Sequence, residues 1–418
     1  MNKTFNFRAR LGHKANPGFL PQDQRLAEIQ NDKFPFVTGQ ELPENAPTFF
    51  GRDYVMHEIL AALRHPDKPR CISLLGERHI GKSSLLNQVF AALGQEEGLI
   101  TIHADIQDWS DCAPDHFFTD LQHAIQELFT DAPLDTAITE EDDPASAIID
   151  YPRFRTALLP HARRYRFLLI LDEFETLIGN PHFDARFFTD LRHLGSAPGL
   201  RFGYLIATRR PLSELRDQHQ PFDSSAFWDI FGIAHVLGLL QPEEGLALMQ
   251  EPWKRSLNGA LLSSEDSKRI RNQVGLHPAL LQIVLERHWW ARDRRSPEAD
   301  KIKRSVSPYL QELWEHRSQA EKEALVRILG GKSITQRASL RDLHNRGLII
   351  KKDQKDTLFA TLFEEFIRQT LEQDPELSQI LTEPETKKDP DSQPPRVKKV
   401  LNSVLKWAGK IGEKRGSK

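Results

Sequence analysis

Short apolar runs alternate with segments of helical spacing between residues 49 and 240. Such runs predict buried strands, and strands that alternate with helices predict a parallel sheet covered on both faces. We therefore expect an α/β fold with this region as its core. The predicted strands span residues 70–75, 99–104, 167–171, 201–207 and 235–239.

The pattern changes on both sides of this core. Residues 1–48 are polar and contain five prolines, which predicts an extended arm with room for one short helix near residues 24–29. Residues 241–301 show helical spacing only and predict an all-helical unit. Residues 302–372 look like a small separate unit, and the charged, proline-rich stretch 373–395 predicts a flexible linker.

The composition is that of an ordinary soluble protein, with 39% hydrophobic and 28% charged residues. Two cysteines, Cys71 and Cys112, exclude a disulfide framework and a cysteine zinc site. Residues 1–20 lack the apolar segment of a secretion signal, and no apolar run approaches the roughly 18 residues of a membrane span. We therefore expect a cytoplasmic protein.

A glycine-rich motif of the form G-x-x-x-x-G-K-S follows the first predicted strand and precedes a helical segment. A strand, a tight turn and a helix N-terminus in this order point backbone N–H groups at a bound phosphate. We expect Lys82 to reach the β- and γ-phosphates of a nucleotide and the Ser83 hydroxyl to bind Mg²⁺. The predicted nucleotide-binding residues here are Gly76, Glu77, Arg78, His79, Ile80, Gly81, Lys82, Ser83 and the following Ser84.

A second candidate for phosphate chemistry is the apolar run that ends at Asp172 and Glu173. Asp172 is expected to hold Mg²⁺, usually through water, and Glu173 to orient and polarise an attacking water. The plainer interpretation is a buried strand that ends at a polar turn, and the upstream glycine-rich motif disfavours it. Glu175 is interpreted as a solvated or supporting acid.

The predicted strand at residues 201–207 ends at the polar residues Thr208, Arg209 and Arg210. In folds with such a phosphate-binding loop, one strand lies between the strand before the loop and the strand that ends at Asp172. Its last residues lie beside the γ-phosphate. Thr208 is then a candidate hydrogen-bond donor. Arg209 or Arg210 is a candidate to stabilise developing phosphoryl charge, and Arg209 is taken as the catalytic one together with Glu173 and Lys82. An arginine pair that is simply solvated at a strand end stays open as the alternative.

Two turn residues, Gly275 and Pro278, interrupt the helical stretch after residue 240. Gly275 can end one helix, and Pro278 can begin the next. His277 lies between them and is a candidate for contact with the nucleotide. A tight corner between two helices is the equal alternative.

Together these motifs resemble the STAND class of signal-transduction ATPases within the AAA+ group, and most of all its bacterial members with an AAA-like ATPase domain. The resemblance covers about residues 49–372. It is carried by Phe50-Gly51-Arg52-Asp53, Gly76 to Ser83, Leu171-Asp172-Glu173-Phe174-Glu175, Ala207-Thr208-Arg209, Phe227 to Leu239 with Glu243-Glu244, and Gly275-Leu276-His277-Pro278.

The resemblance implies a P-loop ATPase core over residues 49–240, a helical lid over 241–301 and a winged helix within 302–372. It also implies that ATP or ADP binds together with Mg²⁺. Typical members carry a repeat array or an effector domain that is not recognisable here, so neither stimulus nor effector is indicated. The residues that the resemblance adds to the site are Phe50, Gly51 and Arg52, whose backbone lines the adenine pocket in the family, and His277 or Pro278, facing the base.

The same resemblance implies a molecular switch. ADP would hold a closed monomer, ATP would open it and permit self-association, and slow hydrolysis through Glu173 would reset it. The protein partner or effector stays unidentified, and a role in bacterial signalling or phage defence rests on the resemblance alone. A nucleotide-bound scaffold without hydrolysis is a further alternative.

The expected winged helix leads to another function. Arg337, Arg341 and Arg346 give its second helix a basic side, as a DNA-recognition helix requires. A DNA-associated AAA+-like ATPase is therefore the alternative, although an acidic body disfavours contacts with phosphates. The predicted elements are helices at 320–329, 335–346 and 362–371 and strands at 347–350 and 357–359.

Residues 396–418 carry eight basic residues and one acid, whereas the whole chain has a net charge of −3. Apolar residues recur on one helical face of this segment, which predicts a basic amphipathic helix. Three acceptors stay open: an anionic surface at the inner face of the membrane, a groove on a protein partner, and the protein's own surface. The apolar positions are Val397, Val400, Leu401, Val404, Leu405, Ala408 and Ile411.

Overall fold

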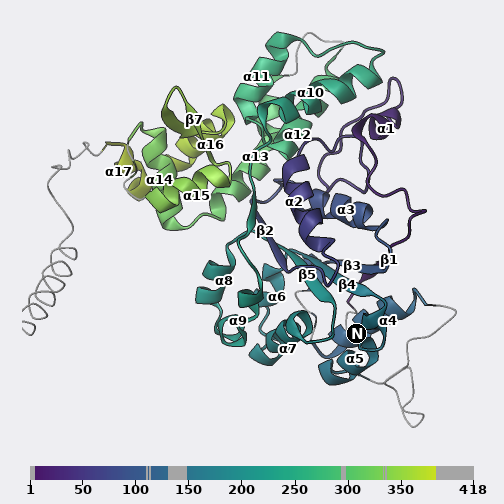
Figure 1. Cartoon of the computed structure of the whole chain (residues 1–418). Coiled ribbons are helices and arrows are strands. Elements are labelled where there is room, and N and C mark those ends of the chain that lie inside the picture. Colours follow the sequence, from purple (N-terminus) through teal and green to yellow (C-terminus); the bar gives the residue numbers. More distant parts are fainter. Residues whose placement is uncertain are drawn as a thin grey trace, which may run out of the picture.

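The computed structural model describes residues 5–109, 112, 114–129, 148–292, 298–332, 334 and 337–382. Its strands are β1 (Arg8–Leu11), β2 (Ile72–Gly76), β3 (Leu99–Asp105), β4 (Arg166–Asp172), β5 (Phe202–Thr208), β6 (His235–Leu237), β7 (Ile349–Lys352) and β8 (Lys355–Leu358). The first six form one 6-stranded sheet in the order β1-β3-β4-β5-β2-β6 (Figure 1). β1 is antiparallel to β3, and the other neighbouring strands are parallel. The predicted α/β class is therefore confirmed. Each of the five predicted core strands corresponds to one of β2 to β6.

Helices cover both faces of this sheet (Figure 1). The helices of the core are α2 (Asp53–Leu63), α3 (Lys82–Leu93), α4 (Phe117–Gln126), α5 (Tyr151–Leu158), α6 (Glu175–Gly179), α7 (Ala185–Ser196), α8 (Leu212–Gln218) and α9 (Gln220–Ser225). Because successive strand side chains point to opposite faces, Leu168 and Ile170 pack with α2 and α3, while Leu169 packs with α4, α5 and α7. Burial on both faces explains why the strands are apolar throughout.

The strand order brings three candidate segments to one edge of the sheet. β2, β4 and β5 are parallel, so their carboxyl ends lie at the same edge. β5 lies between the other two, as predicted. Thr208 is in register with Leu75, the residue before the glycine-rich loop of residues 76–83, here called the P-loop. The P-loop, Asp172 and Thr208 therefore converge where ligands bind in open α/β sheets.

The N-terminal arm contains structure that its sequence does not predict. It contributes the edge strand β1, which the sequence analysis did not predict, and the helix α1 (Gln22–Ala27), which overlaps the short helix expected near residues 24–29. β1 pairs with β3, which lies far along the chain, and no local pattern indicates such a partner. Residues 37–50, here called the strap, lie against α3. The Leu42 N–H donates to Ser84 Oγ at 3.0 Å, and the Asn45 N–H donates to Gln88 Oε1 at 2.7 Å.

The segment after β6 is all-helical, as predicted for residues 241–301. It forms a lid of α10 (Pro242–Ser256), α11 (Ser264–Val274) and α12 (Pro278–Trp290). The predicted boundary at residue 302 is wrong, because α13 (Ala299–Glu315) runs through it. α13 packs on α12 and also on α16 (Thr361–Leu371), so its apolar face is shared by the lid and by the unit that follows.

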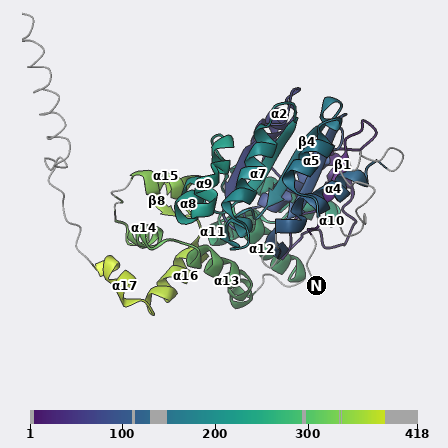
Figure 2. The same cartoon turned by 90° about the horizontal axis from the view of Figure 1, so that it is seen from below.

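The described residues from 317 to 382, here called the C-terminal unit, lie beside the core (Figure 2) and share one hydrophobic cluster with the lid. Its further elements are α14 (Gln319–Leu329), α15 (Arg337–Asn345) and α17 (Pro375–Thr382), with β7 and β8 as an antiparallel hairpin. The order of helices and strands up to α16 is the predicted one. The predicted linker 373–395 is wrong at its start, because Leu377 and Ile380 of α17 are buried in this unit.

The remainder of the predicted linker and the predicted amphipathic helix at 396–418 lie outside the described residues. Within the part of the chain that is described, no helix is both long and apolar enough to cross a membrane. Contact between residues 396–418 and an anionic membrane surface stays a prediction.

Gly203 of β5 offers a test of the packing at the edge of the core. A Cβ at this position would lie 2.3 Å from the carbonyl oxygen of Pro69, which is backbone and cannot swing aside. We expect Gly203→Ala to lower the thermal unfolding midpoint, at a cost of about 1–3 kcal/mol. Gly179→Ala is the control, since no described atom lies within 4 Å of its added Cβ. Equal midpoints of the two variants in circular dichroism would contradict this packing.

Candidate nucleotide site

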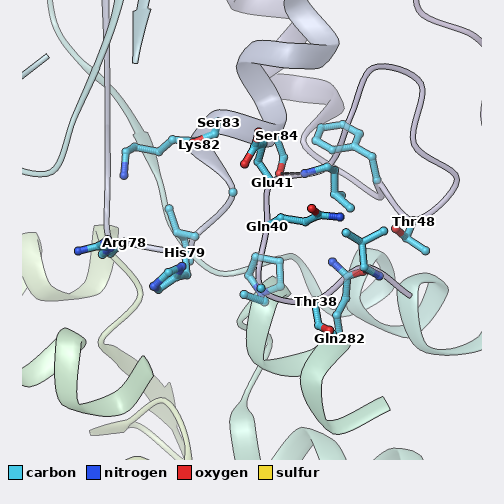
Figure 3. Close-up of a pocket in the computed structure, with 18 of the residues that line it drawn as sticks. Thr38, Gln40, Glu41, Thr48, Arg78, His79, Lys82, Ser83, Ser84 and Gln282 are labelled. Atoms are coloured by element: carbon cyan, nitrogen blue, oxygen red, sulfur yellow. Dashed lines mark hydrogen bonds between the residues drawn. The ribbon is translucent and has the colours of Figure 1, made fainter. Parts of the chain in front are cut away.

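A cavity of about 350 Å³ lies between the P-loop, the strap and the lid (Figure 3). The predicted site residues that line it are Phe50, Arg52, Arg78, His79, Ile80, Gly81, Lys82, Ser83, Ser84, Glu173 and Pro278. The predicted site residues outside this lining are Gly51, Gly76, Glu77, Asp172, Thr208, Arg209 and His277. The structure thus brings most of the predicted site together around one space.

The P-loop has the backbone conformation that anion binding requires. Gly81 precedes α3 with a φ of 99°, and His79 has a φ of 60°. Glycine adopts such angles without strain because it has no Cβ. The first N–H groups of α3 have no partner within the helix and lie beside the cavity, where they can donate to phosphate oxygens. Lys82 Nζ donates to the carbonyl oxygens of Gly76 and Glu77 at 3.1 Å each, so its charge is held at the same loop.

Ser83 and Asp172 form a pair that fits a magnesium ion. Asp172 is buried at the end of β4 and accepts a hydrogen bond from the Glu173 N–H at 2.9 Å. Burial raises the pKa of Asp172 to about 6, against the opposite effects of Lys82 and of a hydrogen bond from Ser83. A hydroxyl beside a carboxylate supplies the hard oxygens that Mg²⁺ prefers. The described residues contain no cluster of three His, Cys, Asp or Glu that could hold a metal by themselves.

Glu173 lines the cavity from a left-handed backbone, with a φ of 52°. For a residue other than glycine this conformation costs on the order of 1–3 kcal/mol, and such strain is concentrated at functional positions. Its carboxylate is paired with Arg209, and Oε2 lies 3.2 Å from the arginine Nε. Movement of Arg209 would therefore change how freely Glu173 can contact water in the cavity.

Glu175 holds Arg209 more closely than Glu173 does. Its Oε1 accepts from the Arg209 Nε at 2.6 Å and from the Arg209 N–H at 3.1 Å. Burial lowers the pKa of Arg209, but the hydrogen bond to Glu175 and the charges of Glu175 and Glu173 outweigh burial and raise the pKa overall. Of the two interpretations of Glu175, the supporting acid is the one that this geometry favours.

Two predicted nucleotide contacts are engaged elsewhere in this structure. The Thr208 hydroxyl donates to the Arg210 carbonyl oxygen at 2.9 Å. His277 caps α12, and its Nδ1 accepts from the Leu280 N–H at 3.5 Å. Burial lowers the pKa of His277 to about 3, so the ring is neutral at physiological pH. Pro278, rather than His277, lines the cavity.

Arg52 joins the P-loop to the start of the lid. Its guanidinium donates to the carbonyl oxygens of Ile80, Gly238 and Leu239 at 3.3, 2.7 and 3.2 Å. Burial lowers the pKa of Arg52 to about 10, opposed by Glu244, and the group therefore stays charged at neutral pH. Its guanidinium thus has a structural role beside the cavity.

The Glu77 side chain extends from the P-loop to the C-terminal unit. Arg317 donates to it from Nη1 at 2.8 Å, and Arg346 forms a second ion pair with the same carboxylate. The three side chains are only 3%, 2% and 5% exposed. Glu321 and Asp342 complete this cluster, since Glu321 pairs with both arginines and Asp342 with Arg346.

This cluster corrects the predicted DNA-recognition face. Arg346 was expected on the basic side of the second helix, but it is buried against Glu77 and cannot contact a phosphate backbone in this arrangement. Arg341 is exposed, and the side chain of Arg337 lies outside the described residues. The basic side expected for DNA binding is therefore not formed as predicted.

Arg78 and His79 continue the contact from the P-loop to α13. Glu312 lies 3.2 Å from Arg78 Nε and 2.7 Å from His79 Nε2. The His79 ring packs edge-on against Tyr309, with 4.7 Å between ring centroids. Burial lowers the pKa of His79, although Glu312 favours its charged form. Three consecutive P-loop side chains thus contact parts of the chain beyond the lid.

The sequence analysis missed the residues that line the cavity away from the P-loop. The strap carries no recognisable motif, and its position depends on contacts with α3 that no local pattern reveals. Gln282 could have been found, because it lies one helical turn after Pro278 and shares its face of α12. The missed lining residues include Thr38, Gln40, Thr48, Phe49, Leu248, Gln282 and Ile283.

A family model described as an AAA ATPase domain matches residues 48–206. This range contains the P-loop, Asp172, Glu173 and most of β5, the same segments that the sheet brings to one edge. The chain contains an AAA+-like P-loop ATPase domain. The comparison with curated proteins found no significant match.

Solved structures resemble this chain beyond the ATPase domain. The Walker-type ATPase PABY2304 of Pyrococcus abyssi is 15% identical, with 79% of this chain and 99% of its own covered and a TM-score of 0.51. The ORC2 protein of Aeropyrum pernix, solved with ADPNP and ADP, is 13% identical over 82% of this chain and 99% of its own, with a TM-score of 0.49. PH0952 of Pyrococcus horikoshii, a STAND protein with a tetratricopeptide repeat sensor, is 15% identical over 85% and 46%, with a TM-score of 0.34. At these identities the likeness concerns the fold alone.

Glu175 and Glu173 of the ATPase domain compete for one arginine, which gives a test of their roles. In Glu175→Gln, Arg209 loses its closer anionic partner and pairs with Glu173 alone. We expect ATP hydrolysis to fall roughly tenfold, as loss of a charged hydrogen bond predicts, with ATP affinity unchanged. Glu214→Gln is the control, because Glu214 pairs with the neighbouring Arg210 instead. A phosphate-release assay that finds equal rates for both variants would contradict the role of Glu175.

Proposed function

We propose that the protein is an ATP-binding molecular switch that hydrolyses ATP slowly, with its C-terminal unit docked on the P-loop in the restrained state. The observation that carries this proposal is the buried ion cluster of Glu77 with Arg317 and Arg346. A residue of the phosphate-binding loop is thereby attached to another unit of the chain. Movement of the loop on nucleotide exchange must then alter the docking contact.

The residues around the cavity supply the chemistry of such a switch. The N–H groups at the start of α3 and the Lys82 ammonium would bind the β- and γ-phosphates. Mg²⁺, held by Ser83 and Asp172, would neutralise phosphate charge when bound. Glu173 would orient and polarise the attacking water, for which its pair with Arg209 must first open. That requirement is consistent with low turnover.

The ion cluster favours two distinct states over a continuum. Removing one partner of a buried ion pair costs about 3–5 kcal/mol, because the remaining charge stays buried without compensation. The docked unit is therefore held firmly or released, with few stable arrangements between. Contacts to the γ-phosphate exist with ATP and not with ADP, and this difference in free energy can shift the population. Release would expose surface for self-association or for an unidentified protein partner.

Nucleotide binding is tested with Lys82→Ala. Loss of the ammonium removes charged hydrogen bonds to phosphate, and we expect ATP affinity to fall roughly 10- to 100-fold, the equivalent of about 1.5–3 kcal/mol. Isothermal titration calorimetry measures this, with Lys14→Ala as the control because Lys14 is exposed and pairs with Glu97. An unmodified chain that binds neither ATP nor ADP would overturn the proposed function.

The switch itself is tested by mass measurement with ADP and with ATP. We expect the unmodified chain to be monomeric with ADP and to self-associate with ATP. Glu77→Gln keeps the shape of the side chain but removes its charge, so the docked state loses its central anion. This variant is expected to self-associate with ADP as well and to hydrolyse ATP several-fold faster.

The control for this variant is Glu265→Gln, a charge change at an exposed position of α11. Multi-angle light scattering gives the masses. A Glu77→Gln variant that stays monomeric with both nucleotides and keeps the unmodified hydrolysis rate would refute the role of the ion cluster.

A further inference from the structure

The strap is attached both to the core and to the lid. On the core side, the Leu42 N–H donates to Ser84 Oγ at 3.0 Å, and Asn87 Nδ2 donates to the Leu42 carbonyl oxygen at 3.0 Å. On the lid side, the Val37 N–H donates to Gln282 Oε1 at 3.1 Å. The residues between these two attachments therefore run from α12 to α3, and they line the cavity on the way.

Apolar side chains hold both ends of this segment as well. Phe36, immediately before the strap, is buried in the hydrophobic cluster that includes the lid. Leu42 is buried in the cluster that includes α2 and α3. The two ends are thus packed in different clusters. A movement that separates the lid from α3 must therefore act on the residues between them.

The middle of the segment lacks such contacts. Gly39, Gln40 and Glu41 are exposed, and none of the three makes a hydrogen bond to another described residue. Gly39 has a φ of 78°, and no described atom outside its chain neighbours lies within 4 Å of a Cβ added there. Residues 38–41, here called the span, are therefore fixed at their ends and unsupported in their middle.

Thr38 closes the lid end of the span. Its hydroxyl donates to Glu286 Oε2 of α12 at 3.1 Å. A hydrogen bond to a carboxylate is stronger than one between neutral groups. In Figure 3, Thr38 is drawn near Gln282 and Glu41 near Ser84. The span thus crosses the cavity from a lid contact to a P-loop helix contact.

We propose that the span is a gate, which must be displaced for a nucleotide to enter or leave the cavity. The inference rests on the proposed function, because it needs a nucleotide bound at the P-loop. When one end of the span is released, the wall between α12 and α3 opens. The rate of nucleotide exchange is then set by the fraction of time for which the span is open.

A gate has a kinetic signature that a binding contact lacks. Loss of a contact with the nucleotide raises the dissociation rate and changes the association rate little. A gate lies on the path in both directions. A substitution that opens it more often raises both rates by a similar factor and leaves the dissociation constant unchanged.

Gly39→Ala tests the gate through the backbone. Alanine disfavours a φ of 78° by an amount that corresponds to roughly a fivefold to thirtyfold shift in population, whereas the released span can adopt other angles. The closed span is destabilised without a steric clash. In stopped-flow fluorescence with N-methylanthraniloyl-ADP and the full-length chain, we expect both rates to rise by this factor.

Gly259→Ala is the matched control. Gly259 also has a positive φ, of 93°, and open space around an added Cβ, but it lies in the loop between α10 and α11 and does not line the cavity. This variant should keep both rates of the unmodified chain. Thr38→Val is the second test, because it removes the hydrogen bond to Glu286 at the lid end. We expect it to raise both rates roughly threefold to tenfold.

With nucleotide in excess, neither rate depends on the fraction of active protein. An unchanged association rate in Gly39→Ala or in Thr38→Val overturns the gate, whether or not dissociation quickens. ADP still binds in that case, so the proposed function stands. An unmodified chain that binds no ADP overturns the proposed function, and this inference with it.

Discussion

The carboxylate of Glu77 links the phosphate-binding loop to Arg317, a residue 240 positions away in the sequence. The carboxylate is buried together with Arg317 and Arg346. Buried charges are stable only when each has its partners in place, so this contact tolerates little change in geometry. The position of the C-terminal unit and the conformation of the P-loop therefore depend on each other. The same loop also lines the cavity, through residues 78–83.

The neighbouring P-loop residues are also bound to other parts of the chain. Arg78 and His79 contact Glu312 of α13, and the carbonyl of Ile80 accepts from Arg52, which also holds the start of the lid. Here Arg78 and His79 are both attached to α13, and Ile80 is attached to Arg52. A phosphate that reorganises the loop would disturb several of these contacts together, which makes the loop suited to a switch.

The features that sequence predicted well have local causes. Continuous apolar runs indicate doubly buried strands, and the glycine-rich loop needs its residues at fixed spacing, so the core strands, the P-loop and the position of Asp172 could be read directly. The errors concern contacts across long separations. β1 depends on a distant partner strand, and α13 is shared by two units. The burial of Arg346 depends on Glu77, and ion pairs between such distant residues leave no periodic pattern in the sequence.

The cavity lies where all of these units meet, and this position gives the nucleotide two separate effects. Its phosphates act on the P-loop and, through Glu77, on the C-terminal unit. The same cavity is lined by residues of the strap and of α12, so a bound nucleotide would contact both segments. ADP and ATP share the base and differ only in the γ-phosphate. Strap and lid would therefore be held together by either nucleotide, while only the contact between the P-loop and the C-terminal unit could distinguish the two.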